Sequence, residues 1–354
     1  MRFSSLKESS KQKIREAMRP FAVRFPQAFG WNRPRFIAVE PTNSCMLKCP
    51  VCATAKAMTR PKGNMSQETF DLLLRQITWR VELLNFAFAG EPLINRRMFD
   101  MILRAHERGL SSAIETNGML LENVIDDIFR SHLGRITISL DGTNQEMLQQ
   151  YRVGADFDKI YRGLKRLTET KRRQRAPYPI IRLQHVVMKQ NEAHLSTFME
   201  MARELGVDEV FLKSFNAELG DWMTPEEKRR NAEAFVPIGK EFSRYADLSK
   251  VTEPLPPEKQ PLCPFPMSSC TVLWNGDVVL CCIDFDASNI LGNIHQTSLG
   301  EIWGSRRYAA YRRKVFNREL AMCKTCDFTM ERNKVIPIAT LSNGKWKGDP
   351  ADGV

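Results

Sequence analysis

Apolar and polar positions alternate along the chain in two different periods up to about residue 213. Short, dense apolar runs predict buried strands at residues 35–40, 83–88, 111–115, 135–140, 180–188 and 209–213. Between these runs, apolar residues at helical spacing predict helices at residues 66–80, 99–109, 121–130, 157–171 and 195–205. Strand and helix therefore alternate with connections short enough for parallel pairing. This is the pattern of an α/β fold, whose ligands gather at the carboxyl ends of the strands.

The pattern changes in the last third of the chain. Residues 253–261 are rich in proline and polar residues, which predicts a linker. Two short apolar runs, 271–274 and 277–280, flank Asn275-Gly276 and predict a β-hairpin closed by a type I′ turn. Residues 299–316 predict a single helix after it. A small hairpin-and-helix unit is therefore expected beyond the α/β region.

Length and composition are those of a globular protein. A chain of 354 residues can form one large domain and a smaller one, and 43% hydrophobic and 26% charged residues are ordinary proportions. No apolar run approaches the roughly 18 residues of a membrane span, and the N-terminus lacks a signal-peptide core. We therefore expect a cytoplasmic protein.

The net charge of +11 suggests an anionic partner, but the basic residues are spread along the chain. Their sharpest excess lies in residues 1–36, where residues 7–21 predict a basic amphipathic helix. That helix either packs on the main domain with its basic face in solvent or contacts a membrane surface. The basic residues of 165–175 predict a solvated helix end, so no nucleic-acid partner is expected.

Three cysteines stand close together just after the first predicted strand. Cys45, Cys49 and Cys52 have the spacing Cys-x3-Cys-x2-Cys. In the cytoplasm such thiols indicate metal ligation rather than disulfides, and three thiolates can bind three corners of a [4Fe-4S] cluster, or zinc. The next cysteine is Cys263, and His106 lies beyond a predicted strand and helix. The fourth corner of a cluster would therefore stay open for a substrate.

This triad at the end of a first strand resembles the cluster motif of the radical S-adenosylmethionine (SAM) superfamily. The resemblance implies a partial (β/α)6 TIM-like barrel, open on one side, in which SAM chelates the open iron of the [4Fe-4S] cluster. It also implies a flavodoxin- or ferredoxin-type electron donor. The reduced cluster of such enzymes cleaves SAM to methionine and a 5′-deoxyadenosyl radical, which removes a hydrogen atom from the substrate.

A second family motif follows the second predicted strand. Gly90-Glu91-Pro92 resembles the Gly-Gly-Glu-Pro motif of radical SAM enzymes, with Ala89 in place of the first glycine. The resemblance implies that the main chain around Gly90 and Glu91 holds the amino group of SAM, because glycine lets the backbone approach a ligand closely. Without the triad, these residues would predict only a turn.

The ends of the next strands offer further SAM contacts. The resemblance implies that Ser139 and Asp141 bind the ribose hydroxyls or the carboxylate of SAM, and Thr116 and Asn117 lie on the same rim. Arg152 could bind the SAM carboxylate through its planar guanidinium. Each of these residues also has an ordinary interpretation, as strand-end turn chemistry or as surface charge.

Six of the nine cysteines lie beyond the proline-rich linker, at positions 263, 270, 281, 282, 323 and 326. Their spacing around the hairpin resembles the SPASM/twitch extension of radical SAM enzymes. No cysteine follows Cys326, so the resemblance implies the shorter form, with one auxiliary [4Fe-4S] cluster as the second cluster of the protein. The implied ligands are Cys263, Cys281, Cys323 and Cys326.

Two cysteines of this region leave the ligand set open. Cys270 could replace one of the four implied ligands, and a zinc ribbon would fit the same spacing. Cys282 adjoins an implied ligand. It is either a buried structural thiol or a catalytic hydrogen-atom donor, as in some radical SAM epimerases.

These observations predict a basic N-terminal extension (1–34), a radical SAM barrel (35–225), a helix and linker (226–262), an auxiliary-cluster domain (263–330) and a C-terminal tail (331–354). The leading hypothesis is an enzyme that oxidises or modifies a sugar, a nucleotide or another small anionic metabolite. The alternatives are an enzyme that modifies a peptide, such as a maturase or epimerase, and a non-catalytic binding protein stabilised by zinc.

Overall fold

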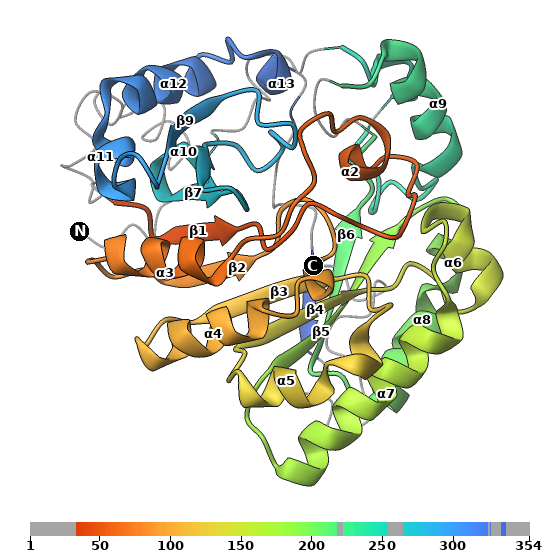
Figure 1. Ribbon diagram of the computed structural model, residues 1–354. Coiled ribbons are helices and arrows are strands. Elements are labelled where there is room, and N and C mark those ends of the chain that lie inside the picture. Colours follow the sequence, from red (N-terminus) through yellow and green to blue (C-terminus); the bar gives the residue numbers. More distant parts are fainter. Residues whose placement is uncertain are drawn as a thin grey trace, which may run out of the picture.

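The computed structural model describes residues 33–217, 222–245, 247–253, 263, 265–324, 326 and 334–337. The basic helix predicted at residues 7–21 lies outside this part of the chain. The described strands form one continuous sheet with the order β10-β6-β5-β4-β3-β2-β1-β7-β8-β9 (Figure 1). Within the described residues, no helix is long and apolar enough to cross a membrane.

Six parallel strands form the larger part of the sheet. They are β1 (Phe36–Val39), β2 (Leu83–Phe86), β3 (Ser112–Thr116), β4 (Arg135–Ser139), β5 (Ile180–Val187) and β6 (Glu209–Ser214). Each strand pairs with the next one in chain order, and every pairing is parallel. The structure thus confirms the predicted strands and the α/β fold of a partial barrel.

Helices cover the outer side of this sheet (Figure 1). They are α3 (Gln67–Gln76), α4 (Met98–Glu107), α5 (Ile125–Arg130), α7 (Phe157–Gln174) and α8 (Leu195–Leu205). Ser66 begins α3 as predicted, because its side chain accepts a hydrogen bond from the Thr69 N–H at 3.1 Å. Two shorter helices, α2 (Ala53–Lys56) and α6 (Gln145–Tyr151), follow the carboxyl ends of β1 and β4, and α9 (Pro225–Phe235) follows β6.

The two faces of the strands differ in chemistry. On one face, apolar side chains such as Ile114, Ile136 and Leu183 are fully buried in the core beneath the helices. Side chains alternate between the faces of a strand, so the other face carries Arg135 and Ser139 of β4 and Arg182 and Gln184 of β5. We call this second, polar side the inner face.

The C-terminal unit continues the barrel sheet instead of standing apart from it. Strand β7 (Ser269–Val272) pairs parallel with β1, and β8 (Asp277–Val279) and β9 (Ile290–Asn293) add antiparallel strands. The predicted hairpin is therefore present, but the prediction of a type I′ turn was wrong. Only Gly276 of the turn has a positive φ, +87°, and its N–H donates to the Leu273 carbonyl at 2.9 Å, so the connection is a type I turn closed by a glycine bulge.

Two further departures concern the end of the chain. The helix predicted at 299–316 is two helices, α11 (Leu299–Gly304) and α12 (Arg306–Phe316), because Ser305 caps the second by accepting from the Tyr308 N–H. The short helices α10 (Phe265–Ser268) and α13 (Ala321–Lys324) flank this unit. Strand β10 (Lys334–Pro337) lies within the predicted tail and pairs antiparallel with β6.

Candidate functional site

The loop after β1 carries the cysteine triad. Cys45, Cys49 and Cys52 are half-buried, and Cys52 stands immediately before α2. Burial raises the pKa of Cys49 to about 11, although Arg152 opposes this, and the thiols of Cys52 and Cys45 raise it further. Because the thiols of Cys45 and Cys52 both raise the pKa of Cys49, the loop holds the three within electrostatic reach of one another.

The surroundings of the triad suit bound thiolates. The Leu47 N–H points to the Cys45 sulfur at 3.4 Å, and the Asn117 amide donates to the same sulfur at 3.8 Å. Such N–H donors favour the charged form of the sulfur. Among the described residues, no three His, Cys, Asp or Glu side chains converge as ligands of a single metal ion. An iron-sulfur cluster takes one thiolate per iron atom, and the three soft donors fit it.

Gly90 lies directly against the triad loop. Its φ is +79°, and a Cβ at this position would approach the Thr42 carbonyl oxygen to 2.5 Å. The Glu91 N–H donates to the Ser44 carbonyl at 2.7 Å, next to Cys45. The conformation and the crowding both require glycine, so Gly90 holds the end of β2 against the cluster loop.

Glu91 links the ends of β2 and β3 through its side chain. Its buried carboxylate accepts from the Thr116 hydroxyl at 2.6 Å, the Asn117 N–H at 2.7 Å and the Leu93 N–H at 3.1 Å. Burial raises the pKa of Glu91, although these hydrogen bonds favour its ionised form. The carboxylate is thus engaged within the protein, and what this segment offers to a ligand is its main chain.

Arg152 and Asp141 form a buried ion pair beside the triad. The Arg152 Nε donates to an Asp141 oxygen at 2.6 Å, and the other Asp141 oxygen accepts from the Val186 N–H at 2.7 Å. Burial opposes the charge of Arg152, but Asp141 and Cys49 together raise its pKa. In the described part of the chain the two terminal nitrogens of Arg152 have no hydrogen-bond partner, so they can still receive an anion.

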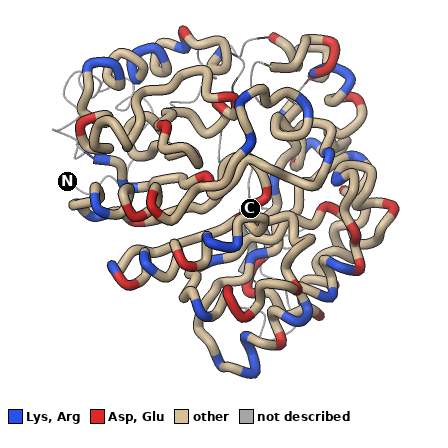
Figure 2. Tube along the Cα trace, in the orientation of Figure 1, with Lys and Arg blue, Asp and Glu red and all other residues tan. Residues whose placement is uncertain are grey.

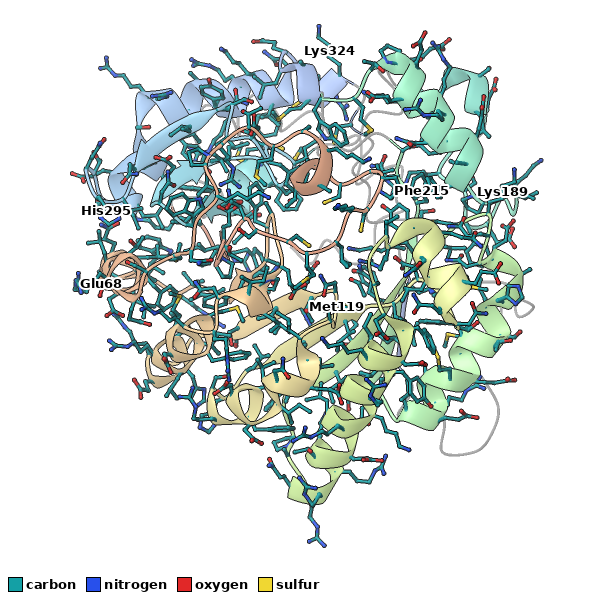
Figure 3. All side chains as sticks on the ribbon, turned by 45° about the vertical axis from the view of Figure 1, so that its right-hand side comes forward. Glu68, Met119, Lys189, Phe215, His295 and Lys324 are labelled. Atoms are coloured by element: carbon teal, nitrogen blue, oxygen red, sulfur yellow. The ribbon has the colours of Figure 1, made fainter. Side chains whose placement is uncertain are left out.

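The remaining predicted residues lie on the same rim of the strands. The Ser139 hydroxyl accepts from the Gln184 amide at 3.0 Å, and the Asn117 amide also reaches the Met46 sulfur at 3.3 Å. Beyond them, Phe215 packs edge-on against Tyr151, where β6 meets α6 and α9 (Figure 3). The rim therefore gathers the predicted polar residues around the triad loop.

The C-terminal cysteines separate into two environments. Burial raises the pKa of Cys263 to about 12, and the thiols of Cys281, Cys326 and Cys323 raise it further. These three thiols therefore lie within electrostatic reach of Cys263. Cys270 is fully buried, which raises its pKa, and among the described residues Arg312 opposes this effect.

Cys282 lies beside the gathered four. A hydrogen bond with Cys282, and then burial, raise the pKa of the Cys281 thiol. Arg318 supports the other end of the set, because one of its terminal nitrogens donates to the Cys323 carbonyl at 2.6 Å and to the Cys326 carbonyl at 2.8 Å.

A contact that the sequence did not indicate joins the two cysteine regions. The Asp286 carboxylate accepts from the N–H and the hydroxyl of Thr59, both at 2.7 Å, and from the Arg60 N–H at 3.0 Å. Arg60 in turn donates to the fully buried Glu40 at the end of β1 and to the Phe285 carbonyl. We call this contact the Asp286 latch. It ties the segment after Cys282 to the segment after α2.

Comparison with known families agrees with this architecture. Residues 39–202 match the model of the radical SAM superfamily, and residues 263–327 match the SPASM model, an iron-sulfur cluster-binding domain. The first domain brings SAM and its [4Fe-4S] cluster as cofactors, and the second brings an auxiliary iron-sulfur cluster.

Two curated relatives are similar over different lengths. The chain is 24% identical over 345 residues to the tungsten-containing aldehyde ferredoxin oxidoreductase cofactor-modifying protein of Pyrococcus furiosus, covering 90% of this chain and 93% of the relative. It is 26% identical over 177 residues to the AdoMet-dependent heme synthase of Methanosarcina barkeri, where the match covers 49% of each chain. The chain thus matches about half the length of the second relative.

Two solved structures share the fold. Streptococcus suis SuiB bound to precursor peptide SuiA aligns with a TM-score of 0.59 at 15% identity, covering 88% of this chain and 75% of SuiB. BtrN in complex with AdoMet and 2-DOIA aligns with a TM-score of 0.51 at 16% identity, covering 83% and 93%. With both domain models matched in the predicted order, the chain belongs to the radical SAM superfamily and carries a C-terminal SPASM-type iron-sulfur domain.

Proposed function

We propose that this protein is an enzyme that cleaves SAM reductively and removes a hydrogen atom from a substrate C–H bond. The observation that carries the proposal is the triad of Cys45, Cys49 and Cys52, gathered at the strand ends beside the Gly90 main chain and the Arg152 guanidinium. When bound there, a [4Fe-4S] cluster would supply the electron for SAM cleavage and leave one iron open to SAM.

In this proposal the chain holds SAM from three sides. The main chain at Gly90 and Glu91 receives the amino group, since the Glu91 side chain is engaged with β3. The terminal nitrogens of Arg152 receive the carboxylate, with Asp141 fixing the guanidinium through Nε. The Ser139 hydroxyl binds a ribose hydroxyl in this proposal, and Thr116 and Asn117 keep the β3 end in place through Glu91.

The C-terminal set would hold the auxiliary cluster through Cys263, Cys281, Cys323 and Cys326. The mutual influence of these thiols supports this choice over Cys270, which packs near Arg312. Cys282 is proposed as the hydrogen-atom donor to a substrate radical. The Cys282→Ala variant should then lose product formation while 5′-deoxyadenosine formation continues, and unchanged turnover would reject the role.

For the substrate we propose a small anionic metabolite, such as a sugar or nucleotide derivative. A peptide is the second candidate, because the fold is shared with SuiB bound to precursor peptide SuiA. The proposal includes a flavodoxin- or ferredoxin-type electron donor, a cytoplasmic location and a possible contact of the N-terminal segment with a membrane surface.

Iron and sulfide per chain after anaerobic reconstitution test the proposal. We expect about eight iron atoms in the parent and about four in the Cys45/Cys49/Cys52→Ala variant, as for two cubane clusters with one at the triad. Four iron atoms that fall to none would confine iron to the triad. Absence of iron from both proteins, with zinc in its place, would refute the enzyme and favour the zinc-stabilised binding protein.

A further inference from the structure

The inner face of β2, β4 and β5 carries several buried polar atoms without a partner. In the described part of the chain, the Asn85 Oδ1, Arg135 Nε, Arg182 Nε and Gln184 Oε1 atoms are buried and make no hydrogen bond. Buried polar atoms in folded proteins are nearly always paired, so each such atom indicates a missing partner. Gln184 as a whole is only 7% exposed.

Strand register places these atoms on one surface. Thr137 of β4 pairs with Arg182, and Ser139 pairs with Gln184, so Arg135, Arg182 and Gln184 project from the same side of the sheet. Burial lowers the pKa of Arg135, and Arg182 is close enough to lower it further. None of these residues takes part in the SAM contacts proposed above.

The donors on this surface lie together at its deeper end. Arg135 forms no ion pair within the described structure, and Arg182 uses one terminal nitrogen on Glu209 at 3.1 Å. Lys213 lies farther toward the strand ends, where it pairs with Val186 and stands beside the Phe211 ring. Glu115 and Glu209 act electrostatically on Arg135, but within the described residues neither forms an ion pair with it. A half-buried guanidinium without an ion pair, next to a second arginine, suits a carboxylate or phosphate group.

The Gln184 acceptor lies nearer the rim, whereas Asn85 shares the level of Arg135 through Ala113. The Gln184 amide nitrogen is already used on Ser139, which leaves its oxygen to receive a donor such as a hydroxyl or amine. A strand rises about 3.3 Å per residue, so Arg135 lies about 13 Å along β4 from Ser139. Arg182 is level with Thr137, which lies about 7 Å from Ser139. This length suits a small metabolite better than an extended peptide.

Resting on the proposed function, we propose that the inner face is the substrate site and that it selects a small molecule with an anionic group and hydroxyl or amine donors. Arg135 and Arg182 bind the phosphate or carboxylate, Asn85 accepts from a donor beside Arg135, and Gln184 accepts from the donors nearer the rim. The donor end then lies at the strand ends, beside the triad loop, where hydrogen abstraction takes place. The distribution of charged residues along the chain does not by itself indicate where an anionic substrate binds, because basic and acidic residues are interspersed over the molecule (Figure 2).

Calorimetric titration of the anaerobically reconstituted protein tests this site. Glycerol 3-phosphate is the probe, because it joins a phosphate to hydroxyl donors, and glycerol and sodium chloride of equal ionic strength are the comparison solutes. We expect the parent to bind the phosphate ester and not glycerol. Arg135→Gln should weaken binding about tenfold or more, since a charge-assisted hydrogen bond is lost. Arg182→Gln should do the same but also leaves Glu209 unpaired, so Arg135 is the primary variant.

Arg166→Gln is the matched control, because it removes the same charge from an exposed position of α7. All variants must keep the circular dichroism and iron content of the parent. Equal binding by Arg135→Gln and Arg166→Gln, or no binding by the parent, would overturn the proposal.

A second comparison addresses the donor end of the site. The parent should bind glycerol 3-phosphate more tightly than inorganic phosphate, and Gln184→Met should remove that difference. A difference that persists in Gln184→Met would overturn the role of Gln184.

Formation of 5′-deoxyadenosine in the same preparations separates this proposal from the proposed function. Ester binding that depends on Arg135, in a protein that never cleaves SAM, would leave the anion site standing and reject the enzyme. If the protein cleaved SAM but Arg135→Gln bound the ester as tightly as the parent, the proposed enzyme would stand and the anion site would be rejected.

Discussion

At the scale of single residues, Glu91 shows how a side chain of the motif can serve the site without touching a ligand itself. Its carboxylate joins β2 to β3 by accepting three hydrogen bonds in a buried position. The main chain of the same residue donates to Ser44 beside the first cysteine. One residue, through its side chain and its main chain, therefore aligns two strand ends with the triad loop.

The Glu91→Gln variant should disturb this alignment. The new amide would turn one acceptor into a donor and leave the Asn117 N–H or the Thr116 hydroxyl unpaired, at a cost of about 1–3 kcal/mol in the free energy of unfolding. Urea denaturation followed by circular dichroism measures this change. Glu107→Gln, at an exposed position of α4, is the control and should stay within about 0.5 kcal/mol of the parent. Equal effects of the two changes would contradict the role of Glu91.

At the scale of an element, the turn after β2 depends on Gly90. Gly109 supplies a natural comparison, because its φ of +72° is similar but a Cβ there would meet nothing within 4 Å. Gly109→Ala should therefore lower the free energy of unfolding by about 1–2 kcal/mol, the cost of the left-handed conformation alone. Gly90→Ala adds the clash with the Thr42 backbone and should cost clearly more.

The same pair of variants tests the connection between this turn and the cluster. Thr42 and Asn43 lead directly into Cys45, so a backbone shift there should lower the iron retained after reconstitution of Gly90→Ala. Gly109→Ala should retain the iron content of the parent. If both variants lost the same stability and kept all their iron, the close approach of Gly90 would have no functional meaning.

The Asp286 latch acts between elements, and its pH dependence can be derived. Partial burial opposes ionisation, but the hydrogen bonds from Thr59 and Arg60 lower the pKa of Asp286 below its ordinary value of 3.8. The ionised carboxylate therefore stabilises the fold fully above that value, and its effect is lost only as the pH falls through the lower, folded pKa.

Asp286→Asn should lower the melting temperature by the same amount from about pH 5 to pH 8, because Asp286 stays ionised over this range. The cost should be about 1 kcal/mol, given its partial exposure. Anaerobic thermal melts of the parent, of Asp286→Asn and of the exposed control Asp126→Asn provide the measurement. A difference that shrinks between pH 7 and pH 5 would show that the latch does not hold an ionised Asp286.

At the scale of the whole molecule, the sequence predicted the local elements of the fold better than the contacts between distant residues. The six barrel strands and the cap at Ser66 follow from short-range periodicity, and the cysteine spacing indicated both clusters. The pairing of β7 with β1 and the latch between Arg60 and Asp286 join residues more than 200 positions apart, and no local signal marks them. The sequence gives a weak signal of the inner face, since Arg182 and Gln184 stand two residues apart in a strand whose other residues, except His185, are apolar. Only the strand register shows that they share a side with Arg135.

The continuous sheet makes the two domains one structural unit. Core residues of the barrel, such as Ile37 and Val39, belong to the same buried cluster as Trp303 and Tyr308 of the C-terminal unit. Trp303 is 2% exposed, its ring lies 4.8 Å from that of Tyr308, and the Arg312 guanidinium lies 4.3 Å above it. A substitution at Trp303 should therefore lower the stability of the whole sheet.

Trp303→Ala tests this cooperativity. Removing a buried tryptophan should cost about 3–5 kcal/mol, and the loss should lower the unfolding midpoint of the barrel helices as well as that of the C-terminal unit. Far-UV circular dichroism follows the helices, and iron-sulfur absorption follows the clusters, during anaerobic urea denaturation. Ile238→Ala, at a side chain 75% exposed, should leave both curves unchanged. Two separate transitions, with the barrel midpoint of Trp303→Ala equal to that of the parent, would mean that β1 and β7 pair without transmitting stability between the domains.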